Sequence, residues 1–495
     1  MKIGEIFSGI DFKVEHAENA TQIEVRGLEY DSRRVEPGCL FFALRGAKTD
    51  GRLYAEDALK RGAVAVAGDQ PAPEGFPAPW ILVEDARRAL AVASRNFFSR
   101  PDESLVTVGI TGTNGKTTTA FVLDSIFNAA GKTTALIGTI EYRIRGEKRS
   151  APNTTPESLD LFRILAELEQ AGGTHVTMEV SSHALALGRV FGLRFHTAVF
   201  TNLTRDHLDF HGTMEAYFAA KQMLFEGCGA PPPAWAAVNM DDPAGRRLKL
   251  APSTRLLRYG VESRADVRAE NISLGAGGLK FEMFTPAGRV AVRSALIGLI
   301  NVYNLLAASS AALACGFDLA TICAGIEQCR SVAGRFERID MGQPFSVVVD
   351  YAHTDDALRN LIRAARSLSP NRVITVFGCG GDRDRTKRPL MGEAAAEGSD
   401  LVVLTSDNPR SEDPLAIMND VMVGLRRYDV PLITEPDRRK AIRLALEEAR
   451  TGDLVLVAGK GHETYQILAD RTIPFDDREV VKEVLHEFGY RQAEK

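Results

Sequence analysis

The chain has 495 residues, of which 45% are hydrophobic and 25% charged, and its formal net charge is -5. This composition is typical of a globular protein, and the length predicts about three domains, each large enough to bury a core. A net negative charge argues against general nucleic-acid binding, which requires a basic domain. No apolar run approaches the roughly 18 residues of a membrane span. The first residues, Met1-Lys-Ile-Gly-Glu-Ile, lack the apolar region of a signal peptide.

The six cysteines contain no Cys-x-x-Cys pair. In a chain of this size they are expected to be free thiols in a reducing compartment, so the expected location is the cytoplasm. A zinc site built from Cys323 and Cys329 is the alternative, and the spacing does not favour it.

Residues 1–100 are expected to mix short strands and helices. The segment 27–44 predicts a strand, a turn and a second strand, and 86–98 predicts a helix that ends before Pro101, the first expected domain boundary. The turn around Ser32 either holds a polar ligand or is an ordinary exposed turn.

A phosphate-binding loop is predicted directly after this boundary. The apolar run 105–110 leads into a turn containing Gly112 and Gly115, and a helix-like segment follows. The two glycines let the backbone approach a phosphate, Lys116 can reach the β- and γ-phosphates, and the Thr117 hydroxyl can bind Mg²⁺. The strict pattern Gly-x-x-x-x-Gly-Lys-Ser/Thr is not met, because position 110 is isoleucine.

Beyond the loop, strands and helices alternate, which predicts a mostly parallel sheet covered on both faces. The strand 174–179 ends in Glu179, and a carboxylate beside a phosphate loop suits a Mg²⁺ ligand or a water-orienting group. The alternative is a surface glutamate. A helix is expected from Ser158, after the polar segment Asn153-Thr-Thr-Pro156. Thr154 or Thr155 next to Pro156 suits a helix start with proline in the first position, where free N–H groups could bind an anionic substrate.

A dense group of acids and histidines follows, comprising Asp206, His207, Asp209 and His211. A site for a transition metal such as zinc is one interpretation of this group. Gly212 follows at once instead of a continued metal-binding helix, so a Mg²⁺ site near His207 is favoured. No Asn-Lys-x-Asp tetrapeptide for guanine recognition occurs, which favours ATP as the nucleotide.

Residues 254–293 are rich in strand formers and glycine, and predict an antiparallel addition. A helix over 297–315 follows, with Asn301 and Asn304 on one face. These two amides either contact adenine or cap the helix.

A second boundary is expected near 331–337. Four strands beyond it end in polar or glycine-rich loops, which predicts a doubly wound sheet with its ligand at the carboxyl edge. The loops span residues 350–353, 378–383, 407–410 and 459–463. The first glycines of the second loop, Gly378-Cys-Gly-Gly, are only a weak dinucleotide signal.

Seven short motifs occur together over nearly all of the chain: Thr111-Gly-Thr-Asn-Gly-Lys-Thr-Thr, Glu179-Val-Ser-Ser-His, Asn202-Leu-Thr-Arg-Asp-His-Leu-Asp, Asn301-x-x-Asn304, Gly334-Arg-Phe-Glu, Asp350-Tyr-Ala-His and Asp407-Asn-Pro-Arg. The combination resembles the Mur ligases, ATP-dependent amide-forming enzymes that build the peptide of the peptidoglycan precursor.

The resemblance implies an α/β protein of three domains. These are an N-terminal UDP-substrate domain (1–100), a central parallel-sheet ATPase domain of the P-loop type (101–331) and a C-terminal Rossmann-like, doubly wound amino-acid domain (332–495). A monomer that binds only small molecules is expected.

The resemblance also implies that ATP phosphorylates the D-glutamate γ-carboxylate of UDP-N-acetylmuramoyl-L-alanyl-D-glutamate. The amine of meso-diaminopimelate would then attack the acyl phosphate. Because two anions must meet, Lys116, the loop amides and Mg²⁺ would have to neutralise charge. The alternatives are the same ligation with L-lysine, a folyl-polyglutamate-type ligase, and a nucleotide-gated binding protein or switch.

The family's functional residues transfer by position to this sequence. For catalysis and Mg²⁺ they are Lys116, Thr117, Glu179, His207 and Lys221, the last being the lysine that the family carbamylates (N6-carboxylysine). For ATP they are Gly112, Thr113, Asn114, Gly115, Lys116, Thr117, Thr118, Asn301, Asn304, Arg335 and Asp350. For the UDP-dipeptide they are Ser32, near the uridine, and Asn153, Thr154, Thr155, Ser181 and Arg189. Two positions depart from the family pattern: Leu187, where a polar residue is expected, and Asp355, where proline is common.

The choice of amino acid would follow from charge. Diaminopimelate is lysine with a second carboxylate, which suits a planar, bidentate cation such as Arg410 or Arg383. Discrimination against lysine could reach about 10⁴-fold. The implied amino-acid site consists of Arg383, Asp407, Asn408, Pro409, Arg410, Gly459 and Glu463, with Asp407, Glu463 and the Gly459 carbonyl receiving the distal ammonium.

Overall fold

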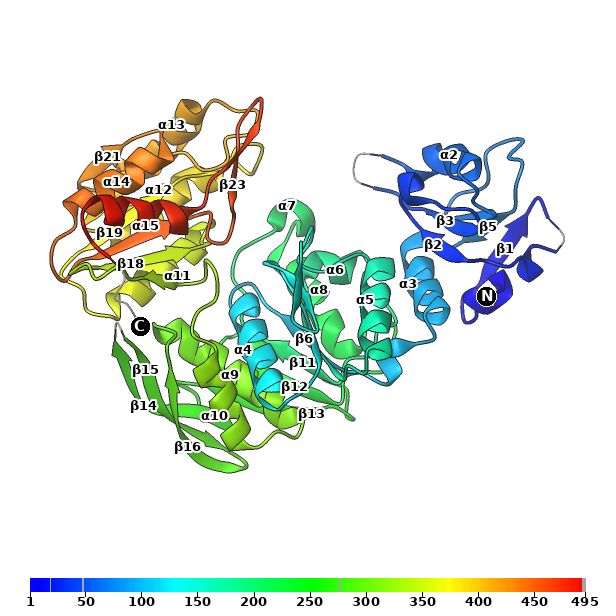
Figure 1. Ribbon diagram of the computed structural model, residues 1–495, viewed down its shortest axis with the longest axis horizontal. Helices are drawn as coiled ribbons and strands as arrows, with labels where there is room; N and C mark the ends of the chain where they lie inside the picture. The colour runs from blue at the N-terminus through cyan, green and yellow to red at the C-terminus, as the bar shows by residue number, and fades with distance from the viewer. Residues whose placement is uncertain (18, 47–48, 276, 492–495) are drawn as a thin grey trace.

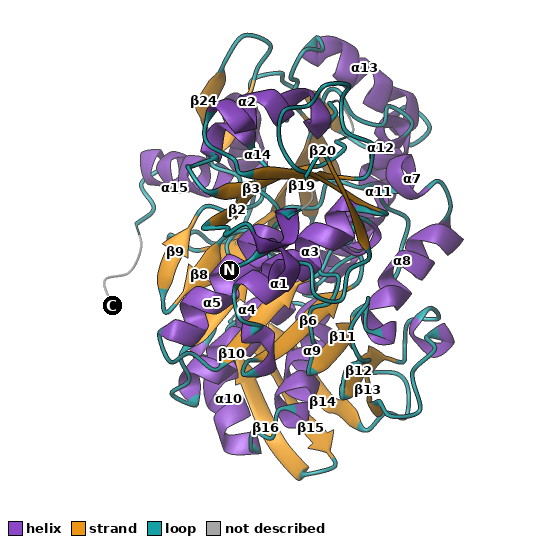
Figure 2. Cartoon of the chain, turned by 90° about the vertical axis from the view of Figure 1, so that its right-hand side faces the viewer, coloured by secondary structure: helices purple, strands orange, loops and turns teal. Residues whose placement is uncertain are grey.

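The computed structural model describes residues 1–17, 19–46, 49–275 and 277–491. Three sheets follow one another along the chain, and the central sheet lies between the other two (Figure 1). Figures 1 and 2 both place the β14–β16 ribbon at the bottom of the view and helix α13 at the top. Among the described residues, no helix is long and apolar enough to cross a membrane.

The first sheet has five short strands, and three helices accompany it. In spatial order the strands are β1 (Phe12–Glu15), β5 (Trp80–Val83), β4 (Ala65–Gly68), β3 (Cys39–Ala43) and β2 (Gly27–Glu29). The helices are α1 (Ile3–Ile6), α2 (Ala55–Lys60) and α3 (Ala86–Phe97). The predicted strand–turn–strand over 27–44 is confirmed, and its two strands pair in parallel.

Among the described residues the central sheet has eleven strands, of which β14, β13, β12, β11, β6, β10 and β7 run parallel to one another. In spatial order the strands are β16 (Gly288–Ser294), β15 (Gly278–Thr285), β14 (Val267–Gly275), β13 (Arg255–Gly260), β12 (Trp235–Asn239), β11 (Thr197–Phe200), β6 (Val106–Thr111), β10 (His175–Glu179), β7 (Thr134–Ile137), β8 (Tyr142–Ile144) and β9 (Glu147–Arg149). The antiparallel addition over 254–293 is confirmed for β14–β16, whereas β13 extends the parallel part.

Helices cover both faces of this sheet, as predicted. One apolar core packs α4 (Lys116–Ala129), α9 (Leu299–Ala314) and α10 (Leu319–Gln328) against it, and a second core packs α5 (Ser158–Gln170), α6 (Ser182–Ala186) and α8 (Met214–Glu226). The short helix α7 (Leu208–His211) projects towards the third sheet (Figure 1).

The third sheet is doubly wound, as predicted, with β18, β22, β19, β20 and β21 parallel and β17 antiparallel at one edge. Its strands are β17 (Glu337–Ile339), β18 (Ser346–Asp350), β22 (Leu454–Ala458), β19 (Val373–Phe377), β20 (Leu401–Leu404) and β21 (Leu432–Thr434). One face packs against α11 (Asp355–Arg366), α12 (Lys387–Gly398) and α13 (Pro414–Leu425), and the other against α14 (Arg438–Glu448) and α15 (Asp477–Glu487). A hairpin of β23 (Tyr465–Ile467) and β24 (Thr472–Pro474) follows β22.

The predicted helix from Ser158 is confirmed, but Pro156 does not occupy its first position. Helix α5 begins at Ser158, with Glu157 as its N-cap, so Pro156 lies outside the helix. The reason is tertiary: the Thr155 hydroxyl donates to the Glu179 carbonyl at 2.9 Å and accepts from the Ser181 N–H at 3.1 Å. These bonds hold the chain extended along the end of β10, and the helix can start only after it.

Candidate active site

The phosphate loop joins β6 to α4 at the carboxyl edge of the central sheet. Gly112 and Gly115 have positive φ values of 147° and 87°, and a Cβ at either position would overlap a side chain, Thr201 or Asn304 respectively. Only glycine can therefore hold this loop so close to its neighbours. Asn202 braces it, since its amide oxygen accepts from the Asn114 N–H at 2.9 Å.

Two lysines converge on one carbonyl oxygen of this loop. Lys116 Nζ donates to the Gly112 oxygen at 3.0 Å and to the Thr113 oxygen at 2.8 Å, and Lys221 Nζ donates to the same Gly112 oxygen at 2.8 Å. Burial lowers the pKa of both ammonium groups, and the charge of Lys116 lowers the pKa of Lys221 further. Two cations crowded at one point create a site with high affinity for anions.

Glu179 ends β10, the neighbour of β6, and its side chain is 1% exposed. Its carboxylate accepts the Thr117 hydroxyl at 2.9 Å, and the Thr139 N–H and hydroxyl at 2.8 and 3.0 Å. A hydroxyl and a carboxylate side by side at a phosphate loop are the oxygen donors that Mg²⁺ prefers.

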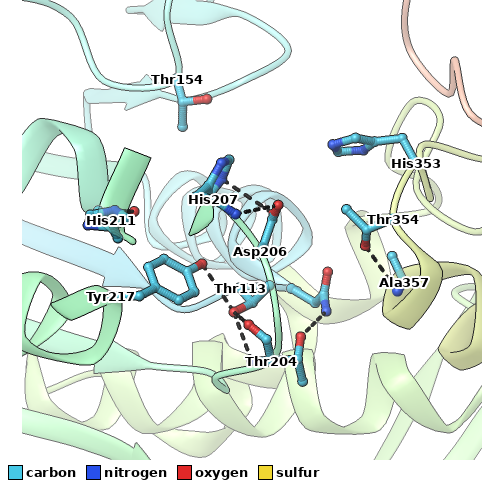
Figure 3. Close-up of polar contacts among 12 residues, drawn as sticks. Thr113, Thr154, Thr204, Asp206, His207, His211, Tyr217, His353, Thr354 and Ala357 are labelled. Carbon is cyan, nitrogen blue, oxygen red and sulfur yellow. Dashed lines mark hydrogen bonds and ion pairs between the residues drawn. The ribbon is translucent and has the colours of Figure 1, made fainter. Parts of the chain in front are cut away.

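His207 lies at the other side of the loop, next to Asp206 (Figure 3). Its Nε2 is 3.3 Å from Asp206 Oδ2, and burial lowers its pKa to about 4, which leaves the imidazole neutral near pH 7 and able to ligate a cation. Burial raises the pKa of Asp206, but His207, His353 and Lys387 outweigh it and bring the pKa to about 2. His353 faces this pair from the side of the third sheet (Figure 3).

Within the part of the chain that the structure describes, no three His, Cys, Asp or Glu side chains are grouped as a metal site would require.

A narrow cavity of about 70 Å³ lies between the phosphate loop and the start of the third sheet. Asn304 Nδ2 donates to Asn301 Oδ1 at 2.9 Å, so the two amides do share a helix face. The predicted ATP residues that line the cavity are Asn114, Gly115, Thr118, Asn301, Asn304, Arg335 and Asp350. Burial raises the pKa of Asp350, whose carboxylate accepts the Phe336 and Ala352 N–H groups at 2.6 and 2.8 Å.

The residues expected to bind the dipeptide form a connected polar network beside Glu179. The Thr154 hydroxyl lies 3.1 Å from that of Thr139, and Arg189 Nη1 donates to the Thr155 carbonyl at 3.0 Å. Ser181 caps α6 by accepting the Ala184 N–H at 3.2 Å. Asn153 is exposed.

Ser32 lies in a cavity of about 870 Å³ on the first sheet, and Glu157, the N-cap of α5, also lines it. Tyr30, Arg33, Tyr54 and Arg87 also line this cavity. Arg189 Nε lies 3.7 Å from Glu157 Oε2, so this cavity borders the dipeptide network.

A further cavity of about 550 Å³ lies between the central and third sheets. His183, Asp206 and His207 line it from the central side. From the third sheet it is lined by six of the seven predicted amino-acid residues: Arg383, Asp407, Asn408, Arg410, Gly459 and Glu463. The seventh, Pro409, packs behind them, where its carbonyl would overlap any Cβ on Gly381. This contact explains the glycine-rich 378–381 loop, which brings two loops together instead of binding a dinucleotide.

Arg410 has a left-handed backbone, with φ of 53°, and its Nη1 donates to the Gly381 carbonyl at 2.8 Å. Such a conformation is uncommon for a residue with a side chain and is often found at functional sites. The guanidinium faces the cavity from a defined position, whereas Arg383 is exposed at its mouth.

Comparisons with known proteins agree with these three regions. Residues 24–98 match the family described as "Mur ligase family, catalytic domain", residues 110–312 match "Mur ligase middle domain", and residues 334–461 match "Mur ligase, glutamate ligase domain". A protein of Solibacter usitatus named UDP-N-acetylmuramoyl-L-alanyl-D-glutamate--2,6-diaminopimelate ligase is 62% identical over 494 residues, with 100% of both chains covered. The chain belongs to the Mur ligase family.

Solved structures resemble this Mur ligase over most of its length. One, titled as the structure of a UDP-N-acetylmuramoyl-L-alanyl-D-glutamate--2,6-diaminopimelate ligase, is 35% identical with a TM-score of 0.70 and covers 99% of each chain. The Mycobacterium tuberculosis folylpolyglutamate synthase, complexed with ADP and AMPPCP, is 19% identical with a TM-score of 0.61. That alignment covers 75% of this Mur ligase and 92% of the synthase.

Several residues of this Mur ligase's site were missed from the sequence. Thr139 and Asn202 each follow a strand of the central sheet at its carboxyl edge, and the rule that found Glu179 could have found them. Lys460 belongs to the predicted 459–463 loop, but the sequence did not indicate that its buried Nζ contacts Asn408, 52 residues earlier.

Proposed function

We propose that this Mur ligase joins meso-diaminopimelate to the D-glutamate γ-carboxylate of UDP-N-acetylmuramoyl-L-alanyl-D-glutamate, with conversion of ATP to ADP and phosphate. The reaction belongs to the cytoplasmic synthesis of the peptidoglycan precursor, and the enzyme acts as a monomer. The observation that carries the amino-acid choice is the cavity of about 550 Å³, in which Arg410 and Glu463 face His207. The 62% and 35% identical relatives bear the name of this activity.

The phosphate loop holds the triphosphate of ATP. In this structure Lys116 Nζ is bonded to two loop carbonyls, and it turns from them to the β- and γ-phosphates when ATP binds. Asn301, Asn304, Arg335 and Asp350 surround the nucleoside end. The loop N–H groups and Lys116 stabilise the charge that develops as the γ-phosphoryl group moves to the substrate carboxylate.

Mg²⁺ fits the oxygen donors at the base of the loop. Thr117 and Glu179 would hold it, with His207 on the far side. When bound, the ion neutralises phosphate charge.

Lys221 fits the modification expected of it. Its side chain is 1% exposed and its lowered pKa leaves more of the amine neutral, the form that can add to carbon dioxide. The resulting carbamate would exchange a positive charge at Gly112 for a negative one, and so provide oxygens for a second Mg²⁺.

The amine then attacks the acyl phosphate. The new C–N bond forms, the amine gives up a proton, and the C–O bond to phosphate breaks. Asp407, Glu463 and the Gly459 carbonyl hold the distal ammonium, and Arg410 holds the distal carboxylate with a bidentate pair. With lysine in the site, the guanidinium would stay unpaired, which opposes binding.

Lysine as substrate, a folyl-polyglutamate-type ligase and a nucleotide switch are the competing functions. The cavity around Ser32 favours a ligase with a nucleotide-linked substrate over a folate enzyme. A switch would turn over ATP slowly and without regard to any amine.

The test is ATP-dependent product formation by the purified chain with the UDP-dipeptide and, in turn, diaminopimelate or lysine, and with folate and glutamate. We expect product with diaminopimelate alone. Equal use of lysine would overturn the amino-acid assignment, and phosphate release only with folate and glutamate would overturn the ligase assignment.

Two substitutions separate the roles of the two cavities. Lys116→Ala should abolish acyl-phosphate formation, because no other side chain replaces its charge at the γ-phosphate. Arg410→Ala should raise the KM for diaminopimelate about a hundredfold, consistent with loss of a bidentate charged pair, while the KM for ATP stays unchanged. Steady-state kinetics with each substrate varied distinguishes the two. A raised KM for ATP in Arg410→Ala would contradict this division of roles between the two cavities.

A further inference from the structure

Lys460 is a buried cation directly behind the amino-acid cavity. Its side chain is 0% exposed and its neighbour Gly459 lines the cavity, but Lys460 itself points into the wall. Its Nζ donates to Asn408 Oδ1 at 3.0 Å and to Glu463 Oε2 at 3.3 Å. Both partners line the cavity.

These contacts fix the orientation of the Asn408 amide. Its Oδ1 accepts from Lys460 Nζ and from the Ile467 N–H at 3.0 Å, and both of these groups can only donate. The oxygen must therefore face Lys460, and Nδ2 must face Glu463, to whose Oε2 it donates at 2.9 Å. A flipped amide would place its NH₂ group against two donors.

The same contacts fix Glu463. Its Oε2 accepts from both Lys460 and Asn408, so Oε1 is the oxygen that remains to accept a hydrogen bond from a ligand. Asn408 in turn keeps one N–H of its NH₂ group for a ligand. The wall thus presents one acceptor and one donor side by side, which matches a centre that carries both an ammonium and a carboxylate.

We propose that Lys460 is a positioning residue that orients Asn408 and Glu463 to receive the distal ammonium-and-carboxylate centre of the incoming amino acid. The inference rests on the proposed function and adds a residue that does not itself touch the substrate. Lys460 also balances the Glu463 charge while the cavity is empty, so the carboxylate does not need to be reorganised when the amino acid binds.

The test is Lys460→Met, which keeps the length of the side chain and removes the ammonium. We expect the KM for diaminopimelate to rise about tenfold or more, because two bonds of a charged group are lost. The kcat at saturating diaminopimelate and the KM values for ATP and the UDP-dipeptide should change far less. Lys460→Gln, which can still donate to Asn408, should recover part of the loss.

Arg372 is a matched control, at the side of the same sheet where the parallel strands begin. Arg372 pairs there with the buried Asp453 at 2.6 Å, and Arg372→Met should lower stability without changing the KM for diaminopimelate. If Lys460 acts through Glu463, adding Lys460→Met to Glu463→Ala should raise the KM little beyond the single Glu463→Ala value.

The outcomes separate the two claims. A wild-type enzyme that does not use diaminopimelate overturns the proposed function. A wild type that uses it, with an unchanged KM in Lys460→Met and Lys460→Gln or with fully multiplicative effects in the double variant, overturns the role of Lys460. If Lys460→Met does not fold, Lys460→Gln decides, alone and combined with Glu463→Ala.

Discussion

Burial favours the neutral form of several ionisable side chains around the candidate site. His207 and Lys221 both have lowered pKa values, and so does His462, which lies where the third sheet meets the segment after α10. Neutral side chains at a phosphate site can bind cations or act as nucleophiles. They also make the fold sensitive to acid, because a side chain that is buried in its neutral form takes up a proton more readily in the unfolded chain.

His462 allows this sensitivity to be measured. Burial, with Arg335 and Arg478 nearby, lowers its pKa to about 3, while the unfolded chain should titrate near the ordinary value of 6.5. Between these values the unfolded state binds more protons, so the free energy of unfolding falls as the pH falls, by up to about 1.4 kcal/mol per pH unit. His462→Gln should remove this part of the slope.

Urea unfolding at pH values from 4 to 7.5 checks this prediction. The difference in unfolding free energy between wild type and His462→Gln should shift steadily in favour of the variant as the pH is lowered. A difference that is the same at every pH would show that His462 takes up no extra proton on unfolding.

At the level of single residues, the sequence predicted the members of the site better than their partners. Glu179 was recognised because it ends a strand beside a phosphate loop. Thr139, which donates twice to it, follows β7 at the same edge but was not singled out, and the contact of Lys460 with Asn408 could not be predicted from the sequence. Their importance comes from contacts between strands that are far apart in the chain.

A buried ion pair between helices α14 and α15 holds the loops of the amino-acid cavity in place. Arg438, the first residue of α14, bonds to Asp477, the first residue of α15, through Nε and Nη2 at 2.7 Å each, and both side chains are 0% exposed. Arg438 also donates to the Ser406 and Ala458 carbonyls at 3.2 and 2.9 Å. Those carbonyls precede the 407–410 and 459–463 loops, so the pair fixes the base of both.

Asp477→Asn should therefore be costly. It leaves a buried guanidinium without its countercharge, and we expect about 3–5 kcal/mol of lost stability, together with a raised KM for the amino acid. Glu447→Gln is the control, since Arg443 and Glu447 form an exposed pair at 2.9 Å whose loss should cost about 1 kcal/mol or less. Denaturant unfolding of both variants gives the comparison, and equal losses would contradict the role of the buried pair.

The type and order of the elements were largely predictable, because strand and helix patterns alternate clearly in both large sheets. Asp355 is the first residue of α11. Proline is common at this position of a helix, and an acid there interacts favourably with the helix dipole. The start of α5 at Ser158 was predicted, but Pro156 lies before the helix, because backbone groups of Glu179 and Ser181 hold Thr155 in an extended segment.

Two contacts between the central and third sheets meet at the site. Lys387 Nζ lies 3.3 Å from Asp206 Oδ1, and Asn114 Nδ2 donates to Asp356 Oδ2 at 3.5 Å. The sequence motifs located each half of the site, but they carried no information on how the halves meet. That arrangement depends on the segment between α10 and β17.

Gly334 constrains the position of this segment, because it packs directly against the loop that follows β22. Its φ is 61°, and a Cβ would overlap the Gly461 backbone and the His462 nitrogen. Gly334→Ala should push the segment away from that loop and move Arg335 and Phe336, which line the cavity of about 70 Å³ expected to hold ATP. We expect the KM for ATP to rise about tenfold or more and kcat to fall, as a displacement of about 1 Å can cause.

Gly316→Ala is the matched control for this change. Gly316 has a similar φ of 86°, but no atom lies within 4 Å of a Cβ built there. Both variants bear the strain of a left-handed alanine, about 1–2 kcal/mol, whereas only Gly334→Ala disturbs a contact between the two halves of the site. ATP kinetics and thermal unfolding of both variants separate strain from displacement, and identical kinetics in the two would mean that the Gly334–Gly461 contact does not align the halves.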